Sequence, residues 1–300
     1  MTGSVPVVAG VELGGTKCIA VIARDRQILQ RAQWPTGDNP AATLGQIADW
    51  LSNAGREEPF AALGIGSFGP LCLDPAAPDY GRIVNTPKPG WSGADIIGGI
   101  AGGFDVPVGL DTDVAGAALA EGRWGASTAC AVHVYITIGT GIGGGIVIDG
   151  KPLHGAFHPE FGHVRVRRAP GDAFAGICPV HGDCLEGLAS GPAIAARAGQ
   201  SAETLSPVDP VWQQVACELA ELLASLILTL APHRIVIGGG VGQGQPALLD
   251  AIRKGTADLL GGYLPGYRLP DLERLIVPPA LGPDAGVYGA IALALATAQR

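Results

Sequence analysis

The chain carries the sequence Gly139-Thr140-Gly141-Ile142-Gly143-Gly144-Gly145 between two apolar runs, Ala129–Ile138 and Ile146–Ile148. Its glycines fit the pattern G-x-G-x-x-G, which binds dinucleotides when a helix opens at that point. Here an apolar strand follows instead, and Asp149-Gly150 then predicts a hairpin turn. We therefore expect a strand–glycine–strand hairpin whose backbone N–H groups face a phosphate, and a dehydrogenase is disfavoured.

A second glycine turn of the same kind lies near the N-terminus, where the run Val5–Leu13 ends in Gly14-Gly15-Thr16-Lys17 and another apolar run follows. Two glycines let the backbone approach an anion closely, and Thr16 adds a hydroxyl. Lys17 either adds a positive charge for the anion or is only a solvated residue of the hairpin. Glu12 is a carboxylate that could hold Mg²⁺ through water. Alone the turn fits an ordinary hairpin, but two such hairpins predict a duplicated domain that grips a polyphosphate.

A third stretch, residues 158–186, contains four nitrogen and sulfur donors, His163, Cys178, His181 and Cys184. Two residues lie between Cys178 and His181, and two more lie between His181 and Cys184. This spacing suits one loop closing on a tetrahedral Zn²⁺ while His163 approaches from the side. Four protein ligands leave no position for water, so the metal would be structural and a zinc hydrolase is disfavoured. Two alternatives stay open: free thiols beside surface histidines, and a disulfide between Cys178 and Cys184, which a cytosolic setting disfavours.

Acidic residues accompany these stretches. Glu160 and Glu186 border the metal loop, which would hold their carboxylates in place. Asp111-Thr112-Asp113 follows the expected strand Val106–Leu110 and precedes the expected helix Val114–Gly122, at the strand end where a parallel sheet presents its chemistry. One of the two aspartates is expected to cap the helix, which leaves the other for a substrate.

Other segments support an α/β reading. Gly238-Gly239-Gly240 leads from an expected strand into the helix Ala247–Leu260, and such a turn can approach a nucleotide by backbone alone. Val211–Leu230 shows a helical apolar stripe, which predicts core packing. Trp91 ends a proline-stiffened loop and is either a hydrophobic plug or a platform for a sugar. Ser92 is expected to cap the helix that follows.

Composition limits the class of protein. The 300 residues allow one large or two medium domains, and a hydrophobic fraction of 47% excludes disorder. The net charge of -8 argues against sequence-independent binding to nucleic acid. No basic region precedes an apolar run at the N-terminus, and the apolar run near Leu222–Ala231 is shorter than the roughly 20 residues that span a bilayer. We therefore expect a soluble, cytoplasmic protein with no membrane partner.

Together these motifs resemble those of the ROK family of sugar kinases and repressors over essentially the whole chain, and within it the bacterial zinc-containing fructokinases. The resemblance implies an α/β chain with the actin-like ATPase (ribonuclease H-like) fold, in which two related domains surround a central cleft. Residues 1–113 would form the small domain and residues 114–283 the large one, which carries the metal loop 158–186. The closing helix, residues 284–300, would pack back on the small domain.

The resemblance also implies roles for individual residues. Asp113 would be the general base. The residues implied for the nucleotide are Gly14, Gly15, Thr16, Lys17, Gly139, Thr140, Gly141, Gly143, Gly238, Gly239 and Gly240. The residues implied for the sugar are Thr112, Asp113, His158, Glu160, His163 and Glu186. The metal ligands would be His163, Cys178, His181 and Cys184. ATP, Mg²⁺ and a structural Zn²⁺ are implied as cofactors, and a homodimer as the assembly.

The implied reaction is ATP-dependent phosphorylation of a hexose, with D-fructose giving fructose 6-phosphate. Glu12, Thr112, His158-Pro159 and the short Thr86–Trp91 loop differ from the glucokinases of the family and fit its fructokinase branch. The alternatives are a kinase for glucose, mannose or an N-acetyl hexosamine, and a sugar-binding regulator without catalysis. Regulators of this family carry an additional N-terminal helix-turn-helix, for which the strand beginning near Val5 leaves no room.

Overall fold

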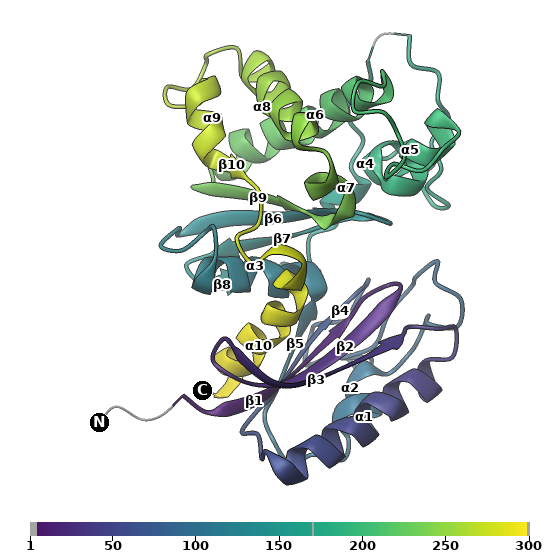
Figure 1. Cartoon of the computed structure of the whole chain (residues 1–300), viewed down its shortest axis with the longest axis vertical. Helices are drawn as coiled ribbons and strands as arrows, with labels where there is room; N and C mark the ends of the chain where they lie inside the picture. Colours follow the sequence, from purple (N-terminus) through teal and green to yellow (C-terminus); the bar gives the residue numbers. More distant parts are fainter. Residues whose placement is uncertain (1–4, 170, 299–300) are drawn as a thin grey trace. The chain divides into compact units, whose positions relative to one another are not determined.

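The computed structural model describes residues 5–169 and 171–298 and divides the chain into two compact units (Figure 1). The first unit consists of the chain up to Arg123, Lys151–His158 and the chain from Asp284 onward. The second consists of Trp124–Gly150 and Pro159–Pro283. The helix that begins at Asp113 thus falls in the first unit. A Cβ atom on its Gly116 would meet Gly289 of the closing helix at 3.3 Å, so the two helices are in close backbone contact.

The sheet of the first unit has the strand order β3-β2-β1-β4-β5. Strands β1 and β2 form an antiparallel hairpin, β3 continues it, and β4 and β5 run parallel to β1. The bounds are β1 Val7–Leu13, β2 Lys17–Arg24, β3 Gln27–Pro35, β4 Leu63–Ser67 and β5 Val108–Thr112.

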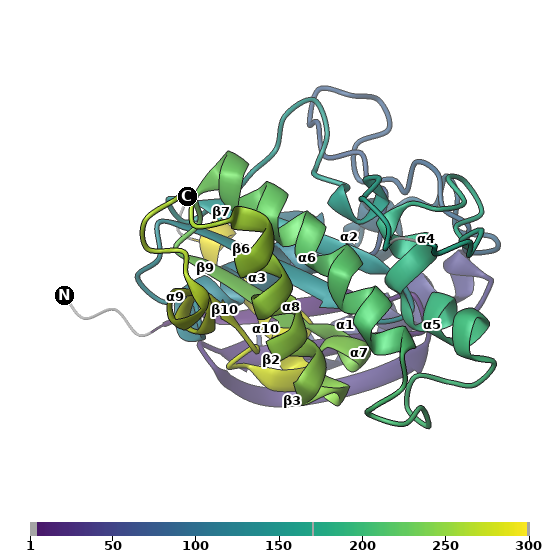
Figure 2. The same ribbon diagram turned by 90° about the horizontal axis from the view of Figure 1, so that it is seen from above.

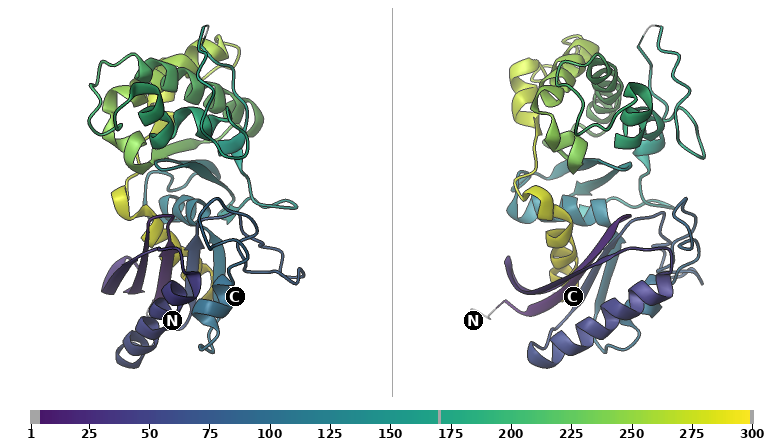
Figure 3. Two further views of the ribbon diagram at one scale, coloured as in Figure 1. Left: turned by 90° about the vertical axis from the view of Figure 1, so that its right-hand side faces the viewer. Right: turned by 45° about the vertical axis from the view of Figure 1, so that its right-hand side comes forward.

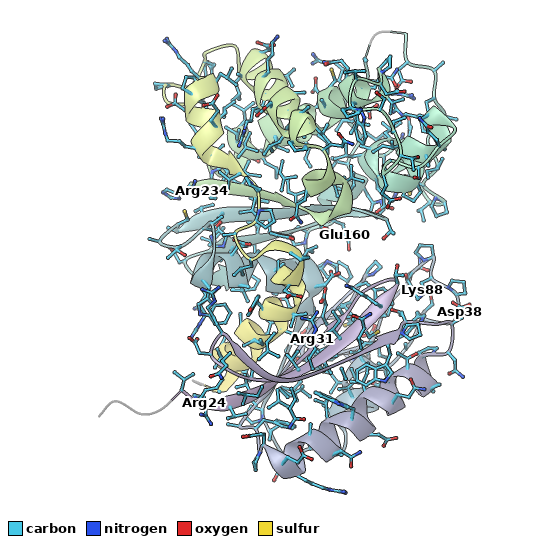
Figure 4. The ribbon with its side chains drawn as sticks, viewed as in Figure 1. Arg24, Arg31, Asp38, Lys88, Glu160 and Arg234 are labelled. Atoms are coloured by element: carbon cyan, nitrogen blue, oxygen red, sulfur yellow. The ribbon has the colours of Figure 1, made fainter. Side chains whose placement is uncertain are left out.

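Helices cover both faces of this sheet (Figure 3). Leu44, Ile47 and Leu51 of α1 join the apolar core on one face. On the other face α10 packs on bare backbone: a Cβ atom on Gly64 of β4 would lie 2.0 Å from the Ala290 carbonyl oxygen. Arg31 of β3 pairs with Asp284, just before α10, at 2.9 Å (Figure 4). The bounds are α1 Pro40–Glu57, α2 Ile96–Ala101, α3 Asp113–Trp124 and α10 Ala285–Ala298.

The sheet of the second unit has the order β10-β9-β6-β7-β8 and repeats the hairpin-plus-parallel-strand pattern, because β6 and β7 are antiparallel and β9 runs parallel to β6. Strand β7 already begins at Ile142, so the loop before it is shorter than the glycine run suggested. Asp149 and Gly150 have φ values of 50° and 75°, as the expected hairpin turn requires. The bounds are β6 Val132–Ile138, β7 Ile142–Ile148, β8 Lys151–Pro152, β9 Arg234–Gly238 and β10 Ile276–Val277.

Helices α6 and α8 pack together over the second sheet (Figure 2). Among the described residues, α6 is the one helix long and apolar enough to cross a membrane, but 61% of that stretch is buried inside the unit, as a core helix would be. Three short helices, α4, α7 and α9, were not expected from the sequence. The bounds are α4 Leu185–Ala189, α5 Gly191–Ala198, α6 Val211–Leu230, α7 Gly239–Gly244, α8 Pro246–Leu260 and α9 Leu269–Leu275.

Candidate active site and metal cluster

The first glycine hairpin joins β1 to β2 with an exposed tip. Gly14 N–H donates to the Lys17 carbonyl at 3.0 Å, and Gly15, Thr16 and Lys17 are exposed. Thr36 braces the turn from behind, since its hydroxyl donates to the Gly14 carbonyl at 2.6 Å. The four residues predicted to bind nucleotide therefore form one fixed turn with an accessible backbone.

Two carboxylates of the first unit, Glu12 and Asp113, have raised pKa values. Asp113 is the first residue of α3, and its Oδ1 accepts the Val114 N–H at 2.9 Å. Burial raises the pKa of Asp113 to about 6. Burial, and then the charge of Asp113, raise the pKa of Glu12 to about 7. Asp113 thus ionises first, and its charge holds the proton on Glu12, an arrangement in which a cation between them would be favourable.

The junction between β5 and α3 differs from the expected one. The helix cap is provided by Thr112, whose Oγ1 accepts the Ala115 N–H at 3.1 Å, rather than by an aspartate. Asp111 is only 2% exposed, and His154 Nε2 lies 3.2 and 3.1 Å from its two carboxylate oxygens. The hydrogen bond to Asp111 raises the pKa of His154. Sequence reasoning missed His154, because the pair joins positions 43 residues apart without a local motif.

His158 and Trp91 are both buried and hydrogen-bonded within the first unit. His158 Nε2 accepts the Leu71 N–H at 3.0 Å, and the residue is 6% exposed, so its predicted sugar contact would require a rearrangement. Trp91 is fully buried and its Nε1–H donates to the Gly37 carbonyl at 2.9 Å, which makes it a hydrophobic plug. Lys88 of the same loop lies 4.0 Å from Asp38 (Figure 4).

The second glycine hairpin, in the second unit, is the contact point of several predicted site residues. Gly139, Thr140 and Gly141 form the turn, whereas Gly143 lies within β7 opposite Thr137. Ile142 N–H, at the start of β7, donates to Glu186 Oε2 at 3.0 Å. One oxygen of the predicted sugar ligand Glu186 is therefore committed to the predicted phosphate hairpin.

The turn formed by Gly238, Gly239 and Gly240 lies against the same hairpin. A Cβ atom on Gly239, whose φ is +83°, would meet the Ile138 carbonyl oxygen at 2.3 Å. A short helix, α7, starts within this turn and was not expected, whereas the expected helix Ala247–Leu260 is α8, which begins at Pro246. Two of the three predicted nucleotide turns are thus in contact within one unit.

The sequence Glu160-Phe161-Gly162-His163 is packed on β7. A Cβ atom on Gly162 would lie 1.8 Å from the Ile142 carbonyl oxygen, so only glycine fits. The Phe161 ring occupies the space beside Gly144, where a Cβ atom would meet it at 1.9 Å. Figure 4 shows Glu160 on the side of the second sheet away from α8. The glycines of β7 thus make room for the element that carries Glu160 and His163.

The four predicted metal ligands converge, with their ligand atoms all within 4.8 Å of one another. His163 Nδ1 lies 3.9 Å from Cys178 Sγ and 3.5 Å from Cys184 Sγ, and His181 Nδ1 lies 3.7 Å from Cys178 Sγ. Tetrahedral zinc with bonds of about 2.3 Å to sulfur and 2.0–2.1 Å to nitrogen places neighbouring ligands roughly 3.5–3.8 Å apart. Both cysteines are free, so the expected alternative of a disulfide is not what the structure contains.

Local structure holds the cluster together. Cys178 and Gly182 exchange two backbone hydrogen bonds, of 3.1 and 2.9 Å, which close the turn that presents His181. Arg165 donates to the His181 carbonyl at 3.2 Å and pairs with Asp183. These contacts hold the turn that carries His181 and Cys184.

A buried ion cluster fixes the long loop between His163 and Cys178. Asp172 accepts from Arg168 at 2.9 Å and lies 3.3 Å from Arg197 of α5. Arg197 also pairs with Glu218 of α6 at 2.6 Å, and both side chains are almost fully buried. The loop is thereby anchored to the helical layer of its own unit.

The predicted site residues divide between the two units. The first hairpin, Thr112, Asp113 and His158 belong to the first unit. The second hairpin, the third glycine turn, both glutamates and the metal ligands belong to the second. Within the second unit the phosphate hairpin, Glu186 and the metal loop form one continuous set of contacts.

Comparison with known proteins shows what this arrangement is similar to. The family model described as the ROK family matches residues 8–297. The fructokinase of Zymomonas mobilis is 45% identical over 97% of each chain, and a putative fructokinase of Bacillus subtilis is 41% identical over 96% of this chain and 95% of that one. A solved ROK hexokinase from Thermus thermophilus superposes with a TM-score of 0.79 at 27% identity, covering 98% of this chain and 99% of that one.

A glucokinase from Streptomyces griseus, solved with glucose and AMPPNP, superposes with a TM-score of 0.73 at 26% identity and covers 96% of this chain and 99% of that one. These likenesses extend over both units, and they agree with the duplicated hairpin-and-parallel-strand pattern. The protein therefore belongs to the ROK family and has its actin-like ATPase fold.

Proposed function

We propose that the protein is an ATP-dependent sugar kinase that converts D-fructose to fructose 6-phosphate. The observation that carries the proposal is the pair of bare-backbone hairpins at equivalent places in two sheets, together with a partly buried aspartate at the head of α3. Relatives named fructokinase, 37–45% identical to this chain, favour fructose as the sugar.

Asp113 would act as general base and accept the proton of the attacking sugar hydroxyl. Its pKa of about 6 suits this role, because the carboxylate is ionised at neutral pH and remains more basic than an ordinary aspartate. Phosphoryl transfer needs little covalent chemistry from the protein, so positioning and charge neutralisation supply most of the rate.

The glycine turns would hold the phosphates of ATP through backbone N–H groups, with Thr16 and Lys17 assisting at the first. Mg²⁺, when bound, neutralises the phosphate charge. Glu12 fits a water-mediated Mg²⁺ site, since it is a partly buried oxygen donor and no hydrogen bond to its carboxylate is found among the described residues.

Zinc fits the set His163, Cys178, His181 and Cys184 by donor chemistry and by spacing. Its contribution would be structural, because four protein ligands complete the tetrahedron. Burial raises the pKa of the Cys184 thiol, so a bound cation would be needed to stabilise its thiolate. We propose that Glu160, His163 and Glu186 orient the sugar hydroxyls from this element, and that Thr112 contributes on the side of Asp113, as does His158 after it releases the Leu71 N–H.

ADP release with fructose, glucose, mannose and N-acetyl hexosamines tests the proposal directly. Fructose should give the highest kcat/KM. A preference for another hexose would leave a ROK kinase of different specificity, and no ADP release with any sugar that nevertheless binds would favour the regulator. The homodimer is a prediction from the resemblance and the cytoplasmic location a prediction from the sequence, and size measurement and fractionation would check them.

A further inference from the structure

Asp111 is a buried carboxylate to which the proposed mechanism gives no task. Its Oδ1 accepts the Thr112 N–H at 2.7 Å, and both of its oxygens lie within hydrogen-bond distance of His154 Nε2. The charge of Asp111 also acts on Tyr80, since burial and then this charge raise the pKa of the Tyr80 phenol. A carboxylate is tolerated in the interior only when it is paired, and His154 supplies the pairing donor.

The contacts of Asp111 lead directly to Asp113. Asp111 holds the N–H of Thr112, the Thr112 hydroxyl oxygen caps α3 at Ala115, and Asp113 accepts the N–H of Val114. Three successive side chains therefore fix the backbone at the turn from β5 into α3. The orientation of the Asp113 carboxylate depends on this backbone, because its own hydrogen bond goes to the next peptide.

His154 belongs to a segment that is attached to the first unit at two points. The segment Lys151–His158 is one of the three parts of that unit. His154 binds Asp111 at the end of β5, and His158 accepts the Leu71 N–H shortly after the end of β4. It therefore spans the carboxyl ends of two adjacent parallel strands, where an open α/β sheet presents its chemistry.

We infer that Asp111 and His154 form a positioning pair for Asp113, in which the imidazole holds the Asp111 carboxylate and the carboxylate holds the turn that aims the general base. The inference rests on the proposed function, in which Asp113 accepts the proton. Neither residue of the pair needs to touch the sugar.

Two substitutions of His154 distinguish the effect of its hydrogen bond to Asp111 from the effect of its side-chain volume. His154→Leu removes the donor but keeps volume, and should lower kcat by about 10- to 100-fold, because a misplacement of about 1 Å costs rate on that order. KM for ATP and for fructose should change less than about threefold, since uniform binding is retained. His154→Gln offers a carboxamide N–H to Asp111 and should recover most of the lost kcat.

Amide hydrogen exchange gives a readout that does not depend on turnover. In His154→Leu the N–H groups of Thr112, Val114 and Ala115 should exchange faster, while those of β1 and β2 keep their protection. Ile47→Val is the matched control, because it loosens the core of the same unit through α1 and should leave kcat and the exchange at the junction unchanged.

Wild-type kcat in His154→Leu, or equal losses in the Leu and Gln variants, would overturn the inference, as would a loss confined to the KM for fructose. Failure of the proposed function would look different: the wild-type enzyme itself would phosphorylate no hexose. Amide hydrogen exchange would still decide whether Asp111 and His154 hold the turn from β5 into α3.

Discussion

At the scale of single residues, the proposed chemistry depends on one carboxylate, Asp113, whose pKa is raised. Asp113 sits at the start of a helix, where the positive end of the helix dipole and the Val114 N–H favour its ionised form, yet burial outweighs both and raises its pKa to about 6. A base of this strength is ionised at neutral pH and still accepts a proton readily.

Asp113→Asn should fold and keep its metal but lose turnover by roughly 10²–10⁴-fold, the usual contribution of a general base. The asparagine keeps the size of the side chain and can still accept the Val114 N–H. Turnover should be measured together with bound metal and thermal stability. Turnover near that of the wild type would remove Asp113 from the mechanism.

The pH dependence follows from the raised pKa of Asp113. Protonation inactivates a base, so the active fraction is complete above the pKa and is lost as pH falls through about 6. We expect kcat/KM, measured at saturating Mg²⁺, to fall about tenfold per pH unit below that value. The residual activity of Asp113→Asn should lack this acidic limb, and a limb centred near 4 would show that Asp113 titrates as an ordinary aspartate.

At the scale of elements, the helices whose bounds could be predicted are those marked by a pattern within their own residues. The expected bounds of α6 coincide with those observed, since a long apolar stripe marks this helix within the chain. Ser92 was expected to cap α2, but the cap is Asp95, whose side chain accepts the Gly98 N–H. Helices α4 and α9 are too short to show a period.

The same distinction applies to the site. The convergence of the four candidate metal ligands was predictable because three of them lie within seven residues, and bringing these together needs only one turn. The contact of Glu186 with Ile142 spans 44 residues, and the glycines of β7 read as a loop because the aromatic ring that covers them comes from Phe161. Such contacts depend on tertiary packing, which no local pattern contains.

Gly162→Ala should disrupt the element that carries Glu160 and His163. The new methyl would lie 1.8 Å from the Ile142 carbonyl oxygen, which is backbone and cannot move aside cheaply. We expect a loss of stability of about 3 kcal/mol or more, together with loss of bound metal, measured by denaturant unfolding and metal analysis.

Gly45→Ala in α1 is the matched control for that substitution. Nothing lies within 4 Å of the added methyl, and the glycine is inside a helix. The change should stabilise the protein by about 0.5–1 kcal/mol. Equal stability of the two variants would show that the packing of Gly162 on β7 is not tight.

At the scale of the whole molecule, the fold repeats one plan twice. Each unit has an antiparallel hairpin joined by a glycine turn and a further strand parallel to the first. In the first unit this plan is extended by the candidate base Asp113, and in the second by the candidate metal loop with Glu160 and Glu186. The proposed chemistry thus combines a duplicated phosphate-binding device with different additions in each copy.

Metal removal tests how the additions in the second unit depend on the cluster. Cys178→Ser should bind less zinc and should raise the KM for fructose more than the KM for ATP, because the loop bearing Glu160 and Glu186 loses its brace. Cys130→Ser, a free thiol of the same unit outside the cluster, is the control. Unchanged sugar affinity without metal would contradict this coupling.

The most direct test of the proposed activity follows the phosphoryl group itself. Phosphorus NMR of a reaction with ATP, Mg²⁺ and fructose should show ADP and fructose 6-phosphate appearing in equal amounts with the wild type, and almost no product with Asp113→Asn over the same period. Hydrolysis of ATP to free phosphate without a sugar phosphate, or equal product from both proteins, would contradict it.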